Sequence, residues 1–84
     1  MVEFYSKKDC PNCVVVKNLL NAEGVVYQTL FVDTNEEAFN KLKDKGFQSV
    51  PQIKKAGGEW LDNCVSSVRK AWASGGLKKM LEEQ

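Results

Sequence analysis

The sequence predicts a small α/β domain over residues 1–84, built from one βαβ unit that a hairpin and two further helices follow. Three observations carry this prediction. β-prone runs alternate with helical patterns along the first half of the chain, and glycines or polar residues stand between them. The length of 84 residues suits one domain with a thin core, which buries only about 60 to 65% of the unfolded surface.

The first predicted strand and helix meet at a pair of cysteines. Residues 2–5 form a short β-prone run, and residues 6–9 form a polar turn after it. Cys10 then occupies a position typical of a helix cap, Pro11 fits the first helical position, and Gly24 ends the helical pattern. The apolar residues that recur at helical spacing in between are Val16, Leu19 and Leu20.

A second strand and a second helix complete the βαβ unit, whose crossover is expected to be right-handed. Residues 25–32 are rich in β-branched and aromatic residues, as in a buried parallel strand. Thr34, followed three residues later by Glu37, indicates a capping box, and Gly46 marks the end of the helix. The residues expected to face inward from this helix are Ala38, Phe39 and Leu42.

The second half of the chain predicts a hairpin and two short helices. A strand over residues 52–54, a glycine turn at residues 57–58 and a second strand around Trp60 and Leu61 make the hairpin. Glycines at residues 75–76 then separate a third helix from the last one. The apolar stripes of these helices are Val65, Val68 and Trp72 in the third, and Leu77, Met80 and Leu81 in the last.

Charge and composition exclude several classes of function. Twelve basic residues against eleven acidic ones give a net charge of +1, so no nucleic-acid partner is expected. No stretch approaches the roughly 20 apolar residues of a membrane span, and we expect a cytoplasmic protein with no membrane partner. Histidine is absent, which removes cysteine–histidine dyads and mixed cysteine–histidine zinc sites. The three cysteines are therefore the candidate reactive groups.

The position of Cys10 predicts an activated thiol. Lowering a thiol pKa from about 8.5 to about 5.5 requires roughly 4 kcal/mol, whereas a helix dipole supplies about 2 kcal/mol at most. Hydrogen bonds from the backbone N–H groups of Asn12 and Cys13, together with the charge of Lys7, are candidates for the remainder. Pro11 has no N–H, but its fixed φ presets the first turn.

The two sulfurs are expected to have different roles. Cys10 attacks a disulfide to form a mixed disulfide, and the more buried Cys13 then attacks Cys10 to release the reduced product. Two other interpretations of the same residues remain open at this point. One is a zinc site formed by the three cysteines, Cys64 included, with Asp62, and the other is an inert buried pair.

Three segments of the chain match the pattern of a known family. Residues 5–13 read Tyr-Ser-Lys-Lys-Asp-Cys-Pro-Asn-Cys, residues 49–53 read Ser-Val-Pro-Gln-Ile, and residues 74–77 read Ser-Gly-Gly-Leu. On these segments the chain resembles the glutaredoxin family, which carries Cys-Pro-Tyr-Cys, Thr-Val-Pro-Gln-Ile and Gly-Gly-Leu at these places. The resemblance implies a thioredoxin-like α/β fold with a four-stranded mixed sheet of order 2-1-3-4 and helices on both faces.

The resemblance also implies a set of site residues. Cys10 and Cys13 become the catalytic pair, and the Val50-Pro51 bond is expected to be cis and to face that pair. The backbone of Val50 then receives the extended chain of a substrate. No metal ligands are implied. The substrate-binding residues implied by position are Lys7, Pro11, Asn12, Lys17, Gln48, Val50, Pro51, Asp62 and Asn63.

The function implied is that of a glutathione-dependent thiol-disulfide oxidoreductase that reduces protein disulfides or glutathione mixed disulfides. Glutathione is the reducing co-substrate, no bound cofactor is expected, and a monomer is expected. Disulfide-containing or glutathionylated proteins are the clients, and ribonucleotide reductase is a candidate client by family analogy only.

One departure from the family pattern keeps alternatives open. The family carries Gly-Gly-x-Asp after its hairpin, whereas residues 60–64 here read Trp-Leu-Asp-Asn-Cys. A related redoxin reduced by thioredoxin reductase is the close alternative, and the Gly-Phe-x-x-x-Pro pattern of residues 46–51 resembles such proteins. An iron-sulfur module, with the cysteines holding a [2Fe-2S] cluster between two chains, is a second class. Pro11 argues against it, because cluster-binding relatives usually carry a less rigid residue there.

Overall fold

Strand β1 (Val2–Ser6) lies at the centre of a mixed sheet in the computed structural model, which describes residues 1–82. It pairs in parallel with β2 (Tyr27–Phe31) and antiparallel with β3 (Gln52–Lys54), so the strand order is β2-β1-β3. The parallel pair makes the segment between β1 and β2 a crossover, as the βαβ prediction requires. A parallel pair, an antiparallel third strand and flanking helices make the mixed α/β arrangement that a thioredoxin-like fold is expected to have.

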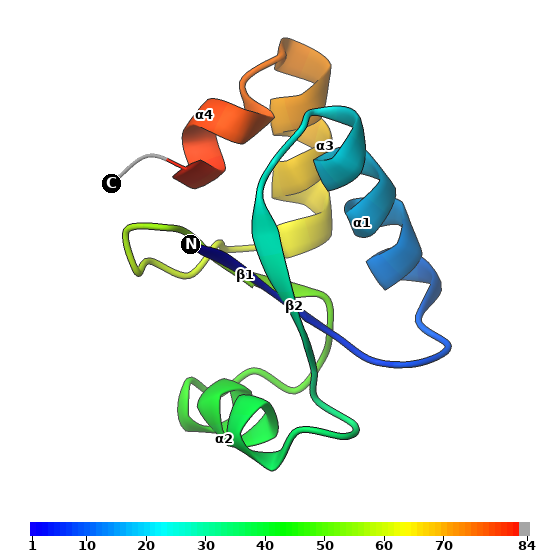
Figure 1. The fold of residues 1–84 in the computed structure, drawn as a ribbon, viewed down its shortest axis with the longest axis vertical. Coiled ribbons are helices and arrows are strands. Elements are labelled where there is room, and N and C mark those ends of the chain that lie inside the picture. Colours follow the sequence, from blue (N-terminus) through cyan, green and yellow to red (C-terminus); the bar gives the residue numbers. More distant parts are fainter. Residues whose placement is uncertain (83–84) are drawn as a thin grey trace.

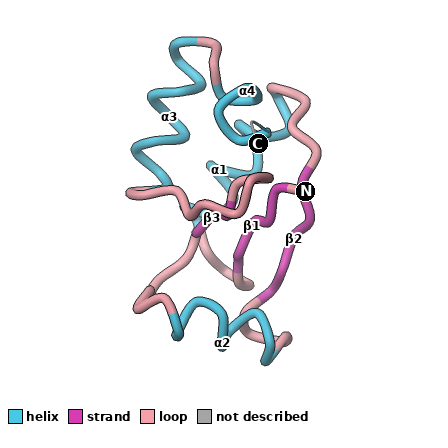
Figure 2. Tube along the Cα trace, turned by 90° about the vertical axis from the view of Figure 1, so that its left-hand side faces the viewer, coloured by secondary structure: helices cyan, strands magenta, loops and turns pink. Residues whose placement is uncertain are grey.

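The helices lie on both faces of this sheet (Figures 1 and 2). Helix α1 (Pro11–Ala22) and helix α3 (Cys64–Ser74) pack together on one side, with the short α4 (Leu77–Glu82) beside α3. Helix α2 (Glu36–Asp44) lies on the other side. No helix within residues 1–82 is long and apolar enough to cross a membrane.

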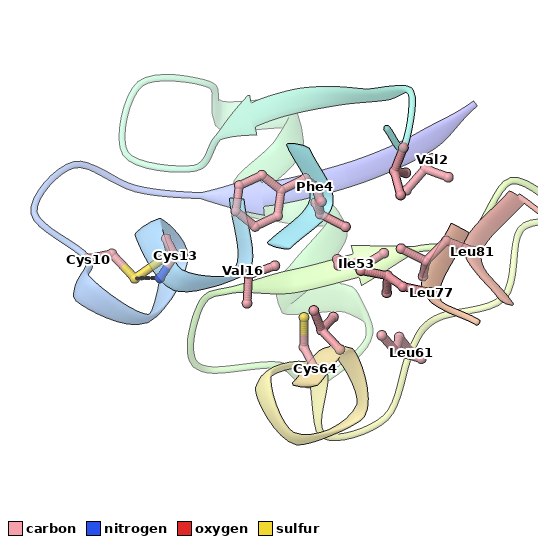
Figure 3. Close-up of a cluster of buried hydrophobic side chains, with 13 residues drawn as sticks. Val2, Phe4, Cys10, Cys13, Val16, Ile53, Leu61, Cys64, Leu77 and Leu81 are labelled. Atoms are coloured by element: carbon pink, nitrogen blue, oxygen red, sulfur yellow. Dashed lines mark hydrogen bonds between the residues drawn. A yellow bond between two sulfur atoms is a disulfide. The ribbon is translucent and has the colours of Figure 1, made fainter. Parts of the chain in front are cut away.

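The alternation of side chains along β1 divides the core into two clusters. Val2 and Phe4 face α1 and α3, whereas the buried Tyr5 packs with Ala38 and Leu42 of α2. In Figure 3 the cysteine pair lies at one end of the larger cluster, and the leucines of α4 lie at the other end. The remaining buried members of the larger cluster are Cys10, Cys13, Val16, Leu20, Val25, Ile53, Leu61, Cys64, Val68, Leu77 and Leu81.

The predicted fourth strand is wrong: among the described residues, the sheet has three strands, in the order 2-1-3 rather than 2-1-3-4. The hairpin does form, since the N–H of Lys55 donates to the Glu59 carbonyl at 2.7 Å and the N–H of Leu61 donates to the Ile53 carbonyl at 2.9 Å. Its second arm is reduced to one isolated bridge, Lys54 with Trp60. The arm is this short because the chain turns directly after Leu61 toward the start of α3.

Three local predictions are also wrong. The cap of α2 is Asn35 rather than Thr34, and its side chain accepts a hydrogen bond from the Ala38 N–H at 3.1 Å. Phe39 and Trp72, both expected in the core, are 50% and 46% exposed. In a domain this thin, one or two positions per turn suffice to cover the sheet, and Ala38 and Leu42 already do so for α2.

Candidate functional site

Cys10 caps α1 as predicted. Its backbone is extended, with φ −113° and ψ 100°, and its Sγ accepts a hydrogen bond from the Cys13 N–H at 3.2 Å. Pro11 occupies the start of the helix. Of the two N–H donors predicted for this sulfur, only that of Cys13 bonds to it among the described residues.

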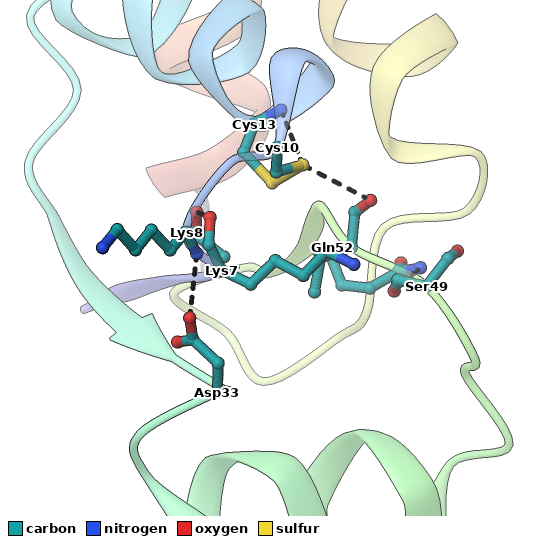
Figure 4. The surroundings of a disulfide bond; sticks show 9 residues. Lys7, Lys8, Cys10, Cys13, Asp33, Ser49 and Gln52 are labelled. Atoms are coloured by element: carbon teal, nitrogen blue, oxygen red, sulfur yellow. Dashed lines mark hydrogen bonds between the residues drawn. A yellow bond between two sulfur atoms is a disulfide. The ribbon is translucent and has the colours of Figure 1, made fainter.

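Cys10 and Cys13 are joined by a disulfide, with their Cα atoms 5.2 Å apart (Figure 4). Cys10 is the more accessible of the two, at 9% exposed against 4% for Cys13. The Sγ of Cys10 lies 3.9 Å from the carbonyl oxygen of Val50. The outer sulfur therefore stands beside the loop that precedes β3, where a substrate chain is expected.

The Val50-Pro51 bond is cis, as the resemblance predicts. Behind it the side chain of the buried Gln52 donates to the Ser49 carbonyl at 3.1 Å, which ties the start of β3 back to the loop. On the other side of the cysteines, the N–H of Lys8 donates to the Asp33 carboxylate at 3.0 Å (Figure 4). Both loops that flank the disulfide are thus held by a side-chain hydrogen bond.

A groove of about 670 Å³ runs from the cis-proline loop to the start of α3. Asn63, the cap of α3, has a left-handed backbone with φ 49° and makes no side-chain cap hydrogen bond. Because Asn63 does not cap them, the first-turn N–H groups of this helix lack the usual N-cap acceptor, a setting that favours an anion. The predicted site residues that line this groove are Asn12, Val50, Pro51, Asp62 and Asn63.

The other predicted residues line two different grooves. Lys7, Pro11 and Lys17 line a second groove of about 660 Å³, and both cysteines line it too. Gln48 lines a third groove of about 390 Å³, next to α2, which Lys7 and Val50 also border. The structure thus distributes the predicted residues around the disulfide instead of gathering them into one pocket.

Several lining residues were not predicted from the sequence. Phe47, Ser49 and Ser66 line the first groove, and Val14 and Phe31 line the second. Ser49 stands inside the Ser-Val-Pro-Gln-Ile motif, which is the one signal that points to it. The exposed Val14 and Phe31 lie on periodic elements, where the sequence gives no sign that they are left uncovered.

Cys64 is a free thiol, buried among apolar side chains at the start of α3 (Figure 3). Burial raises its pKa from the ordinary 9.0 to about 12, so the thiol is protonated near neutral pH. Within residues 1–82, no group of three or more cysteine, histidine or carboxylate side chains is arranged to hold a metal ion. Cys64 is consequently a small apolar core residue in this fold.

Comparison with known proteins agrees with this geometry. The Glutaredoxin family model matches residues 2–60. Glutaredoxin 3 of Escherichia coli (strain K12) is 42% identical over 53 residues, which cover 62% of this chain and 64% of that protein. A crystal structure of a buckwheat glutaredoxin-glutathione complex is 29% identical with a TM-score of 0.76, covering 98% of this chain and 76% of the buckwheat chain.

A further match is to a much longer protein. Santalene synthase of Santalum album is 32% identical over 73 residues, which cover 86% of this chain but only 12% of the synthase. Because the chain spans so small a share of that enzyme, the match carries no information on the activity of this chain. The family model, in contrast, spans more than half of the chain and includes the disulfide and the cis-proline loop. The chain belongs to the glutaredoxin family.

Proposed function

We propose that this chain is a thiol-disulfide oxidoreductase that uses glutathione to reduce protein disulfides and glutathione mixed disulfides. The observation that carries the proposal is the Cys10 sulfur, which caps α1, accepts the Cys13 N–H and lies 3.9 Å from the Val50 carbonyl. A sulfur at a helix N-terminus is stabilised as a thiolate, the form that attacks disulfides. Clients include disulfide-containing proteins, with ribonucleotide reductase as a candidate.

Reduction of a client disulfide proceeds in two exchanges. The Cys10 thiolate attacks one client sulfur, the client S–S bond breaks, and the second client sulfur leaves as a thiolate that takes a proton from water. The Cys13 thiolate then attacks Cys10 Sγ, which releases the first client thiol and closes the Cys10–Cys13 disulfide. Two electrons pass from the dithiol to the client.

Glutathione restores the dithiol in two further exchanges. One glutathione thiolate attacks Cys10 Sγ, forms a mixed disulfide and frees the Cys13 thiolate, which takes up a proton. A second glutathione thiolate attacks the sulfur of the bound glutathione, so glutathione disulfide leaves and Cys10 returns as a thiolate. A glutathionylated client enters the same cycle when Cys10 attacks its glutathione sulfur and the client thiol departs, and that route needs no second cysteine.

The groove between the cis-proline loop and α3 is the proposed place for glutathione. Peptide groups at Val50 can pair with an extended cysteinyl chain, and the uncapped first turn of α3 suits a carboxylate. Asp62 and Asn63, both exposed on this groove, can bind an α-amino group and a carboxylate. The glutathione complex of the buckwheat relative supports the assignment.

A second candidate is a redoxin that thioredoxin reductase recharges. The observation in its favour is the Trp-Leu-Asp-Asn-Cys segment over residues 60–64, where Asn63 rather than a glycine takes the left-handed turn. An electron-donor assay decides between them: the protein is mixed with a disulfide substrate, NADPH and either glutathione with glutathione reductase or thioredoxin reductase alone, and NADPH consumption is followed. Our proposal requires turnover in the first mixture, and turnover only in the second would overturn it.

A further inference from the structure

Strand β2 is an open edge of the sheet. The strand order β2-β1-β3 leaves its outer side without a partner strand among the described residues, as Figure 2 shows. The opposite edge is closed differently, because β3 carries Lys54 and the hairpin arm covers it through the bridge from Lys54 to Trp60. Lysines and covering segments are the devices by which natural proteins block pairing at a sheet edge, and β2 has neither.

The composition of this edge favours pairing with another strand. Residues 24–32 include no charged residue and no proline. Val26 and Phe31, near the two ends of the segment, are 62% and 48% exposed. The pairing of β2 with β1 runs from Tyr27 to Phe31 without a bulge that would twist the edge away. A regular, uncharged edge with exposed apolar residues is a template for a further strand.

The backbone of β2 presents alternate residues to the outside. The N–H of Val32 donates to the Ser6 carbonyl of β1 at 2.9 Å, and in a parallel ladder every second residue before it points toward β1 in the same way. The intervening residues, Tyr27, Thr29 and Phe31, therefore direct their N–H groups to the outer side. These are the groups that an added strand would bind.

Both ends of this open edge are closed within the chain. At one end, the N–H of Val26 donates to the Glu82 carboxylate at 3.4 Å. At the other end, the carbonyl of Phe31 accepts the N–H of Asn35 at 2.8 Å. The open edge thus extends over residues 27–31, and Thr29 is its midpoint.

An edge whose midpoint is an outward-directed residue is complementary to a second copy of itself. In an antiparallel pair centred on Thr29, the two Thr29 residues exchange N–H and C=O groups, and the Phe31 N–H of each copy donates to the Tyr27 carbonyl of the other. Gln28 then lies opposite Leu30 of the other copy, so no like charges meet across the strands. The same residues are used on both copies, as a two-fold interface requires.

The charges beside the strand are also complementary to a copy of themselves. A hollow of about 240 Å³ next to Gln28 and Leu30 is lined by Glu3 and by two residues one turn apart on α2, Glu37 and Lys41. A two-fold axis through the paired strands places both α2 helices on the same face of the joined sheet. Lys41 of one copy is then available to Glu37 of the other.

We propose that β2 is a self-association surface, through which two copies of this chain join their sheets into one by antiparallel pairing centred on Thr29. The family resemblance leads to the expectation of a monomer, and the open edge is the observation that revises it. One strand pair buries less surface than a permanent dimer interface, so the dimer should dissociate in the micromolar range.

The dimer is compatible with the redox site. No residue of β2 lines the groove proposed for glutathione, so that groove stays open in both copies. Thr29 and Phe31 line the groove on the opposite side of Cys10 and Cys13, and the second copy lies along that side. Neither a metal cluster nor a disulfide between the copies is needed for this association.

The test measures the dimer dissociation constant of the oxidised chain by sedimentation equilibrium, over concentrations from about 10 μM to about 1 mM. Thr29→Pro removes an outward N–H that β1 does not use, and proline is tolerated at such edge positions. Thr29→Lys places two ammonium groups opposite each other at the two-fold axis. The controls are Thr29→Val, which keeps the N–H, and Trp72→Lys on α3, where the side chain is 46% exposed. Circular dichroism verifies that each variant is folded, and Thr29→Lys keeps the test decisive if Thr29→Pro does not fold.

We expect Thr29→Pro to raise the dissociation constant about thirtyfold, because the two symmetry-related hydrogen bonds that it removes contribute a factor of about five each. Thr29→Lys should raise it at least about tenfold by repulsion between like charges. Both controls should leave it unchanged. In the unmodified chain, amide hydrogen exchange at Thr29 and Phe31 should become slower as the protein concentration rises.

Three results would each refute the proposal. The first is an unmodified chain that stays monomeric over the whole concentration range. The second is a dimer whose dissociation constant is the same in both Thr29 variants and in the unmodified chain, which would place the interface elsewhere. The third is dissociation of the dimer by Trp72→Lys with no effect of Thr29→Pro, which would assign the contact to α3.

Discussion

Cys10 is the N-cap of α1, the position from which a side-chain atom can accept hydrogen bonds from the free N–H groups of the first turn. Its extended backbone points Sγ back over the first turn, where the Cys13 N–H donates to it at 3.2 Å. The sequence predicted this placement because a cap and a first-turn proline are local features that need no tertiary context. The contact with the Val50 carbonyl, in contrast, joins residues 40 positions apart and came only from the family motif.

In the reduced Cys10–Cys13 pair, Cys10 should be an acidic thiol and Cys13 an ordinary or weak one. Cys10 gains a hydrogen bond and the helix dipole as a thiolate, so its pKa should lie well below the free value of about 8.5. The rate of alkylation by iodoacetamide, measured against pH in Cys13→Ser, gives the midpoint directly. A midpoint at or above about 8.5 would contradict the activation of Cys10.

Cys64 should make the folded state less stable in alkali. Its pKa is about 12 when folded and 9.0 when exposed, so between these values the unfolded chain binds fewer protons and the free energy of unfolding falls as pH rises. Between pH 8 and pH 10.5, we expect the free energy of unfolding to fall by about 2 kcal/mol less in Cys64→Ala than in the unmodified chain. Below about pH 9, the difference between the two proteins should not change with pH.

Urea denaturation of both oxidised proteins at the two pH values measures this difference. Burial and a hydrogen bond to Glu3 also raise the pKa of Tyr5, so both proteins should lose stability in alkali. Subtracting the free energies of unfolding of Cys64→Ala from those of the unmodified chain isolates the contribution of the Cys64 thiol. Parallel curves would show that Cys64 is not protected from ionisation in the folded state.

The helix ends show how precisely sequence patterns locate the first and last residues of one helix. The limits of α1 followed from Pro11 and Gly24, and the break between α3 and α4 followed from Gly75, whose φ of 79° closes α3. The start of α2 was misplaced by one residue, because Thr34 and Asn35 are both good caps and the pattern with Glu37 favoured Thr34. Only the hydrogen bond from the Ala38 N–H to the Asn35 side chain identifies Asn35 as the cap.

This distinction leads to a stability prediction for α2. Asn35→Ala should lower the free energy of unfolding by about 1 kcal/mol, because it removes the acceptor of the Ala38 N–H. Thr34→Ala is the matched control and should change stability by less than about 0.5 kcal/mol. Urea denaturation of the oxidised protein measures both, and a larger loss for Thr34→Ala would restore the capping box as the true start of the helix.

At the scale of the whole molecule, the described residues form separate grooves beside the disulfide, and sequence patterns could not predict how the site residues divide between them. The motifs predicted which residues approach the cysteines, but not that Lys17 and Asp62 would line different grooves. Nor did periodicity separate the buried Ala38 from the exposed Phe39, because which side of α2 meets the sheet depends on how the thin layers pack. The described residues form no fourth strand because the length of the second hairpin arm depends on where the chain turns into α3, which is a tertiary feature.

The central claim is that Cys10 alone carries the exchange with glutathione, while Cys13 serves the reduction of client disulfides. The most direct measurement is deglutathionylation of a small mixed disulfide by the unmodified chain, Cys10→Ser and Cys13→Ser, with glutathione and glutathione reductase as the electron source. Our account predicts substantial activity in Cys13→Ser and none in Cys10→Ser. Loss of all activity in both variants, with turnover of the unmodified chain by thioredoxin reductase and not by glutathione, would contradict it.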